Sequence, residues 1–205
     1  MKFKTSTFFL LIIVYATGAS AQRYQGVAGV QYSMGSTTGE SANYISDFSF
    51  RGFGMEYDKF ITPQLSIGFL AGWNIFDELL HDATIDVNGS TISGTQIRFL
   101  NVFPILAKFG YFLGNPKSNF RPYASLGVGT YYIMQRLDIG LFHIEKDNWH
   151  LGLAPAIGIL IPTKYVFFQI NVRYHYAFAA DDSITKEPFD ISYLTYNIGI
   201  TIPTW

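Results

Sequence analysis

The segment from Val166 to Phe178, which alternates strictly from Phe168 onward, most constrains how this chain can fold. Successive side chains of a β-strand point to opposite faces, so this segment is a strand with one apolar and one polar face. The apolar face holds Phe168, Ile170, Val172, Tyr174, Tyr176 and Phe178, and the polar face holds Gln169, Asn171, Arg173, His175 and Ala177. A soluble protein would bury the apolar face. Because the rest of the chain repeats this pattern behind a secretion signal, we predict that the apolar face touches lipid and the polar face lines a small barrel.

The first 21 residues have the pattern of a secretory signal peptide. Lys2 and Lys4 give a positive start, and residues 8–16 form an apolar run that is too short for a transmembrane helix of roughly 20 residues. The small residues Ala19 and Ala21 form a cleavage site before Gln22. We therefore predict a cleaved signal peptide over residues 1–21 and one barrel domain over residues 22–205.

The composition fits a membrane barrel better than a soluble secreted domain. Charged residues make up 14% and aromatic residues 18% of the chain, whereas soluble domains have roughly 25% charged residues. There is no cysteine, which excludes a disulfide framework and thiol chemistry. The formal net charge of −1 gives no indication of nucleic-acid binding.

The alternating pattern predicts an all-β fold, an eight-stranded antiparallel up-and-down transmembrane β-barrel. Each strand is long enough for the roughly 9–11 residues that a tilted strand needs to cross a bilayer. The predicted strands are residues 24–34, 47–60, 65–75, 95–112, 123–135, 149–161, 166–178 and 191–202. Long polar connections over 35–46, 76–94, 136–148 and 179–190 alternate with short turns. Because such barrels have long extracellular loops and short periplasmic turns, both ends of the barrel domain are expected in the periplasm.

Three local features predict departures from regular strands. Phe48 and Phe50 are out of phase with the following strand, which predicts a bulge near Arg51 and Gly52. Pro104 lies within the fourth strand and removes one ladder donor, so we expect a bulge or distortion there. Asn88-Gly89 is typical of a type I′ turn and predicts a β-hairpin above the membrane.

The two rims of the predicted barrel differ in charge. The charged residues of the long connections are mainly acidic: Glu40, Asp77, Glu78, Asp82, Asp86, Asp138, Glu145, Asp147, Asp181, Asp182, Glu187 and Asp190. The short turns instead carry Lys59, Lys117, Arg121 and Lys164. One explanation is that the acidic residues keep the solvent-exposed rim hydrated. Alternatively, it binds divalent cations that bridge lipopolysaccharide phosphates, or a basic partner.

The sequence resembles the small outer-membrane β-barrel or porin-family proteins of Gram-negative bacteria, which include OmpA-, OmpX- and OmpW-like barrels. The resemblance covers the whole of residues 22–205 and rests on Arg121–Gly129, on Gly54–Tyr57 and on Gly199 in an aliphatic last strand. It implies a cell outer membrane location, contact with outer-membrane lipid and lipopolysaccharide, insertion by the barrel insertion machinery, and a monomer. Trp205 departs from the usual pattern, since this terminal aromatic residue is one position out of phase with the outward set.

Six titratable residues fall on the inward face and are predicted to form a lumen charge network: Glu56, Asp58, Arg98, Lys108, Arg173 and His175. A charge such as Arg173 would cost about 2–4 kcal/mol in the lipid midplane, so these residues must face the lumen. An eight-stranded barrel is just wide enough for side chains to fill it, which favours a plug of paired charges. Several inward glycines leave room for a narrow water path instead.

No motif in the chain indicates catalysis. His150 and His175 with Ser125 or Ser192 lack the spacing of a nucleophilic site, so a lipid-modifying enzyme is a distant alternative. We expect no cofactor and no metal site. A soluble lipocalin-like barrel is the main rival fold, but its exterior would be polar. The sequence thus predicts a structural or surface-interaction role through acidic extracellular loops, with a narrow porin or small-molecule conduit as the alternative.

Overall fold

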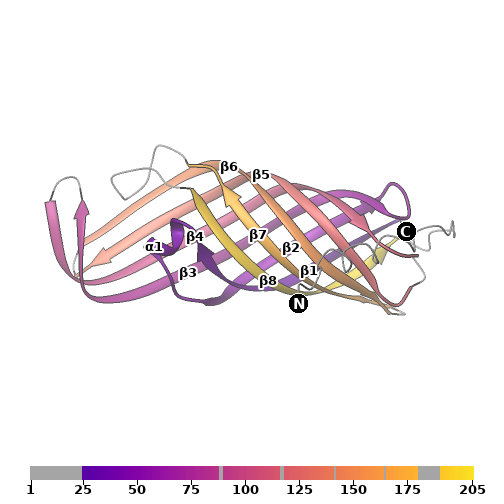
Figure 1. The fold of residues 1–205 in the computed structure, drawn as a ribbon, viewed down its shortest axis with the longest axis horizontal. Coiled ribbons are helices and arrows are strands. Elements are labelled where there is room, and N and C mark those ends of the chain that lie inside the picture. Colours follow the sequence, from indigo (N-terminus) through magenta and orange to yellow (C-terminus); the bar gives the residue numbers. More distant parts are fainter. Residues whose placement is uncertain (1–24, 88–89, 116–117, 141, 164, 180–189) are drawn as a thin grey trace, which may run out of the picture.

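The computed structural model describes residues 25–87, 90–115, 118–140, 142–163, 165–179 and 190–205. In this part of the chain, eight antiparallel strands follow in sequence order and close into one barrel, because the last strand pairs with the first (Figure 1). The strands are β1 (Gly26–Thr38), β2 (Ser49–Phe60), β3 (Leu65–Val87), β4 (Ser90–Phe112), β5 (Arg121–Ile139), β6 (Phe142–Pro162), β7 (Phe167–Ala177) and β8 (Ile191–Thr204). A short helix, α1 (Ser41–Tyr44), follows β1. The predicted eight-stranded up-and-down barrel is confirmed.

The hydrogen-bond register determines the tilt of the strands. One circuit of paired residues that starts at Ala28 passes through Tyr57, Phe69, Ala107, Val128, Leu153, Tyr176 and Ser192 and returns to β1 at Thr38. The circuit therefore ends ten residues further along β1 than it began. A stagger of this size tilts the strands of an eight-stranded barrel by about 40° and leaves an interior that side chains can fill.

The barrel has an apolar outside, as the alternation in β7 predicts. Phe168, Ile170 and Tyr174 are 38–48% exposed, whereas Asn171 and Arg173 between them are at most 3% exposed. The other strands also point large apolar side chains outward, including Val30, Phe53, Phe69, Ile105, Leu126, Ile157 and Ile198. A continuous apolar band on a closed barrel is the surface that contacts lipid, so the chain spans a membrane with its strands.

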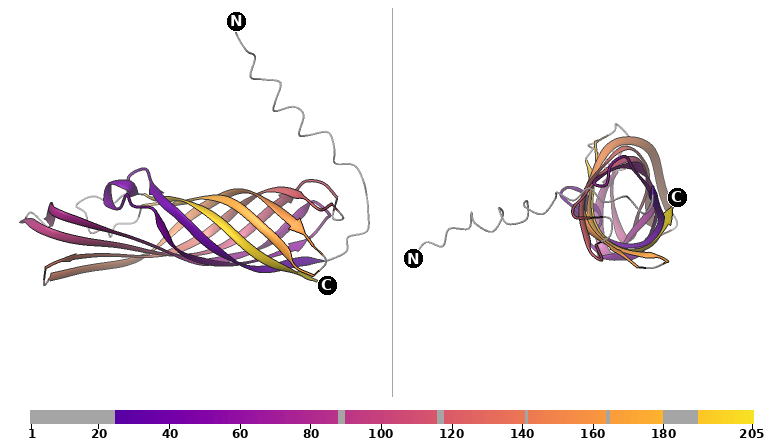
Figure 2. Two further views of the ribbon diagram at one scale, coloured as in Figure 1. Left: turned by 90° about the horizontal axis from the view of Figure 1, so that it is seen from below. Right: turned by 90° about the vertical axis from the view of Figure 1, so that its right-hand side faces the viewer.

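Two of the four long connections are much shorter than predicted, although the arms of the hairpin expected within residues 76–94 do pair. Residues 76–87 and 90–94 continue β3 and β4, and residues 136–139 and 142–148 continue β5 and β6. The two hairpins project well past the end of the barrel (Figures 1 and 2). Polar composition alone indicates loops here, but the backbone groups of these segments pair across the hairpins, which composition does not show.

Other expectations fall partly outside the described residues. The signal segment 1–21, the Asn88-Gly89 turn itself and residues 180–189 are among them. The arms of the predicted hairpin are described, and they pair from Thr84 with Ser93 to Val87 with Ser90. No helix in the described residues is long and apolar enough to cross a membrane.

The predicted bulge in β2 is present. Ser33 pairs with Gly52 but Gly35 pairs with Ser49, so β2 holds one extra residue at Phe50–Arg51. Opposite Pro104 the distortion is milder, because pairing between β3 and β4 lapses at Gly72 and Trp73 without any change of register.

Candidate functional site: the filled lumen

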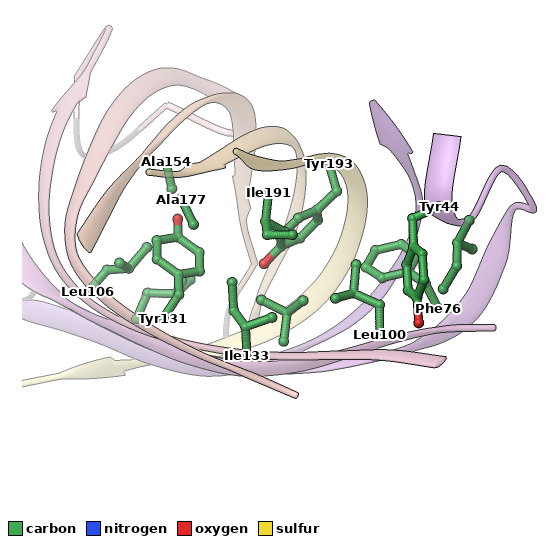
Figure 3. Close-up of a cluster of buried hydrophobic side chains, with 13 residues drawn as sticks. Tyr44, Phe76, Leu100, Leu106, Tyr131, Ile133, Ala154, Ala177, Ile191 and Tyr193 are labelled. Atoms are coloured by element: carbon green, nitrogen blue, oxygen red, sulfur yellow. The ribbon is translucent and has the colours of Figure 1, made fainter. Parts of the chain in front are cut away.

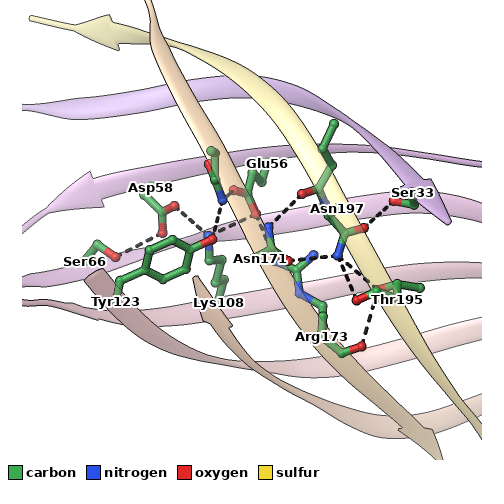
Figure 4. Close-up of polar contacts among 12 residues, drawn as sticks. Ser33, Glu56, Asp58, Ser66, Lys108, Tyr123, Asn171, Arg173, Thr195 and Asn197 are labelled. Carbon is green, nitrogen blue, oxygen red and sulfur yellow. Dashed lines mark hydrogen bonds and ion pairs between the residues drawn. The ribbon is translucent and has the colours of Figure 1, made fainter. Parts of the chain in front are cut away.

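Four of the predicted lumen charges meet near the middle of the barrel. Lys108 of β4 lies between the two acids of β2, with its Nζ atom 3.0 Å from Glu56 Oε2 and 2.7 Å from Asp58 Oδ2. Arg173 of β7 reaches across the lumen and places Nη2 3.1 Å from the same Glu56 oxygen (Figure 4). All four side chains are at most 3% exposed. The cluster is electrically balanced, with two acidic and two basic groups, which is what a buried set of charges requires.

Alternation and one glycine bring this cluster together. Glu56 and Asp58 are two residues apart on β2, so both point inward. Gly68 of β3 pairs with Asp58 on one side and with Lys108 on the other. Because Gly68 has no side chain, Lys108 can reach over it to Asp58. A Cβ atom at Gly68 would lie 1.7 Å from the carbonyl oxygen of Tyr57, which leaves no room for another residue.

Buried polar side chains complete the hydrogen bonds of the charge cluster. Ser66 Oγ donates to Asp58 Oδ1 at 3.0 Å. Gln169 Nε2 donates to Glu56 and also, at 2.6 Å, to the Tyr123 hydroxyl. Asn197 Nδ2 donates to Asn171 Oδ1 at 2.8 Å and extends the polar layer toward β8 (Figure 4). These hydrogen bonds link strands on opposite sides of the lumen and hold them in one register.

His175 does not join the charge cluster. Its ring stacks on Tyr193 with 4.3 Å between centroids, and its Nδ1 lies 3.1 Å from the Tyr131 hydroxyl. Asn74 Nδ2 lies 3.4 Å from the Tyr193 hydroxyl on the other side. His175 is therefore part of an aromatic layer with Tyr131 and Tyr193.

Arg98 also lies apart, at the mouth on the hairpin side of the barrel. Its Nη1 donates to the carbonyl oxygen of Tyr44 at 2.9 Å, and its guanidinium lies over the Tyr44 ring. Burial raises the pKa of the Tyr44 phenol, whose hydroxyl donates to the carbonyl oxygen of Arg136 at 3.1 Å. Ser46 donates to Glu78 of β3 through both its amide and its hydroxyl. The segment between β1 and β2 is thus folded inward across the mouth.

Apolar layers close both ends of the lumen, which corrects the prediction of a polar interior. The layer at the hairpin end surrounds Tyr44 and contains Ile45, Leu70, Phe76, Leu100, Val102, Leu106, Tyr131, Ile133, Ile191 and Tyr193 (Figure 3). The layer at the opposite end contains Val27, Phe60, Phe112, Tyr123, Leu160 and Phe167. A signal for the first layer existed in the sequence, since β4 is apolar at both phases around Leu100, Val102 and Leu106.

The sequence predicted that Arg121 belongs to a basic rim. In the structure it belongs instead to this second apolar layer. The side chain is fully buried. Its guanidinium lies 5.2 Å from the ring centroids of Phe60 and Phe112, and Nη2 donates to the Pro63 carbonyl oxygen at 2.5 Å. An arginine stacked in this way closes the mouth opposite the hairpins with its planar side chain.

Three acidic residues at the hairpin end have partners in the described part of the chain. Asp77 lies 2.8 Å from Arg51, and Asp138 lies 2.8 Å from Arg136. Tyr132 donates to Asp147 at 2.5 Å. Among the described residues, no group of three or more His, Asp or Glu side chains is arranged to hold a metal ion.

The comparisons with known proteins concern the fold. The chain matches no protein-family model and no curated protein. Among solved structures, it is similar to Neisserial surface protein A, with 15% identity, 87% of this chain and 95% of that chain covered, and a TM-score of 0.49. It is also similar to the attachment invasion locus protein Ail of Yersinia pestis, with 11% identity, 86% and 95% covered, and a TM-score of 0.46. The N-terminal β-barrel domain of Pseudomonas aeruginosa OprF matches with 13% identity, 87% and 98% covered, and a TM-score of 0.46.

These likenesses concern the fold alone, and the assignment to a fold class rests on the chain's own topology. The closed antiparallel barrel, the staggered register and the apolar exterior are all present in the described residues. In fold, the chain is a small single β-barrel of eight antiparallel strands with an apolar exterior, as its sequence predicts.

Proposed function

We propose that the protein is an outer-membrane barrel with a non-conducting lumen, which acts through the sheet that it projects from the cell surface. The observation that carries this proposal is the length of the central strands. β3 and β4 each have 23 residues, whereas roughly 9–11 residues cross a bilayer. The excess lies at one end of the barrel and forms a rigid sheet that the membrane does not require (Figure 2).

The filled lumen supports a structural barrel over a conduit. A path for ions would have to pass the apolar layer around Tyr44 and Leu100, then the ion pairs of Glu56, and finally the aromatic layer at Arg121. Each of these is a set of buried, packed side chains. Separating the Glu56 ion pairs to open a path would leave unpaired charges buried in the barrel, which is energetically costly.

The first test is single-channel conductance of the refolded protein in a planar bilayer. We expect insertion without conductance steps at neutral pH. A variant with Tyr44, Leu100 and Tyr193 all changed to alanine removes three large side chains from the layer at the hairpin end, but it keeps the Glu56 ion pairs and the layer at Arg121, so it too should not conduct. Discrete steps from the unchanged protein, altered by Glu56→Gln, would contradict the proposal and establish the conduit.

The projecting sheet offers two strand edges to a partner. In the described residues, β2 pairs with β3 only as far as Ile75, and β7 pairs with β6 only as far as Gly152. The outer parts of β3 and β6 are therefore edges of a four-stranded sheet formed by β3, β4, β5 and β6. Strand edges present unpaired backbone groups that bind extended segments of other proteins.

We propose that the acidic residues of the projecting sheet stabilise the sheet itself. Asp77, Asp138 and Asp147 are held by Arg51, Arg136 and Tyr132, so they order the sheet more than they offer free charge to divalent cations. We propose that the barrel contacts outer-membrane lipid and lipopolysaccharide through its apolar band, is inserted by the barrel insertion machinery, and is monomeric.

Antibody labelling of intact cells tests the orientation of the projecting sheet. An epitope inserted after Gly140, an exposed glycine with φ of 57° between β5 and β6, should be labelled on intact cells. The same epitope inserted after Thr62, in the turn between β2 and β3, should be labelled only after the outer membrane is permeabilised. The opposite pattern would place the hairpins in the periplasm and would rule out a surface role.

A further inference from the structure

A small cavity lies in the lumen between the charge cluster and the aromatic layer. It leaves about 10 Å³ in which the centre of a water molecule can move. Six polar side chains line it: Gln31, Ser33, Asn74, Arg173, His175 and Asn197. Each of the six is at most 6% exposed. The volume is at the lower limit for one water, and such a water needs two to four polar partners.

The polar side chains around the cavity have hydrogen-bonding capacity left over. Arg173 carries five N–H groups, and in the described part of the chain its side chain donates to Glu56 through Nη2. His175 uses Nδ1 toward Tyr131, which leaves Nε2 for another partner. Asn74 uses its Nδ2 toward Tyr193, so its oxygen can still accept. The cavity thus has both donors and acceptors on its walls.

The backbone adds a further reason for a ligand at this place. Pro104 and Gly72 line the cavity, and the pairing of β3 with β4 lapses where these two residues face each other. Proline has no N–H group, so one ladder donor is missing at this point. A water molecule in the cavity can donate in place of that N–H group.

We propose that this cavity is a binding site for one structural water, which links the charge cluster to the aromatic layer and substitutes for the donor missing at Pro104. The cluster of Glu56, Asp58, Lys108 and Arg173 is already balanced, so a neutral ligand adds no uncompensated charge. An anion beside Arg173 would leave the site with a net negative charge. This inference concerns the interior of the barrel and is independent of the proposed surface role.

The test is a crystal structure at a resolution that shows ordered solvent, with a second crystal soaked in bromide. We expect one solvent peak within hydrogen-bonding distance of at least two of the six polar side chains, without an anomalous bromide signal. A cavity without density would overturn the proposal, and an anomalous peak would replace the water by an anion.

Gly72→Ala supplies an independent check in solution. A Cβ atom at Gly72 points into this region and would lie 3.1 Å from the Phe53 carbonyl oxygen and 3.5 Å from Pro104 Cγ, so a methyl group fits with a small shift. In detergent micelles, nuclear Overhauser contacts between the cavity amides and a long-lived water should be present in the unchanged protein and lost in this variant. Gly127→Ala, whose Cβ atom would meet Leu106 away from the cavity, should retain them. Contacts that survive Gly72→Ala would contradict the site.

Discussion

Replacing Glu56 with alanine should lower the free energy of unfolding by about 3–5 kcal/mol. Glu56 accepts hydrogen bonds from Lys108, Arg173 and Gln169, all of them buried. When the carboxylate of Glu56 is removed, the charge of Arg173 in the lumen is no longer balanced, and Lys108 keeps only Asp58 as its acidic partner. The expected loss comes mainly from this stranded positive charge, because breaking a buried ion pair costs far more than the pair contributes in net terms.

Urea titration of the protein folded into lipid vesicles measures the loss. Asp77→Ala is the matched control, since it also removes an acid that pairs with an arginine at 2.8 Å, but at an exposed site where about 0–1 kcal/mol is expected. Replacing Glu56 by leucine together with Arg173 by methionine should recover much of the stability, because both charges leave together. If Glu56→Ala and Asp77→Ala have equal effects, the cluster does not hold the barrel together.

Changing Val172 to arginine should lower the stability of the inserted barrel by about 2–4 kcal/mol, because it places a charge in lipid near the bilayer midplane. Val172 is in the middle of β7, and its side chain points outward between the exposed Ile170 and Tyr174. A soluble barrel with the same strand would tolerate arginine on its outer face. The prediction therefore tests directly whether the apolar face of the alternating strand contacts lipid.

The control for this prediction lies at the end of the same strand. Phe178→Arg also changes an outward apolar residue, 46% exposed, but one that directly follows β7 at the rim on the hairpin side, where about 0–1 kcal/mol is expected. Urea titration in vesicles and the fraction of protein assembled in the membrane report both effects. Equal effects of the two substitutions would contradict a membrane around the middle of β7.

The identity and direction of each strand could be predicted because alternation is a local property. In β7, Phe168 and Gln169 reveal by their chemistry alone which face meets lipid and which meets the lumen. The same reasoning predicted a bulge near Arg51 and Gly52, because Phe48 and Phe50 break the phase, and the structure has it one residue earlier, at Phe50–Arg51. It failed for the strand extensions, where polar residues such as Asp77 and Asp138 have the composition of loops but pair across a hairpin.

The sequence by itself determined that the chain forms eight amphipathic strands, and it placed all six lumen charges on inward-facing positions. Only the tertiary structure decided which of them meet. The stagger of ten residues around the barrel brings Lys108 and Arg173 to Glu56 and leaves Arg98 at the mouth with Tyr44. That stagger is set by the pairing of all eight strands at once, so no local pattern contains it. Tyr44, Leu100 and Arg121 fill the lumen only because β8 pairs with β1 and closes the barrel around them.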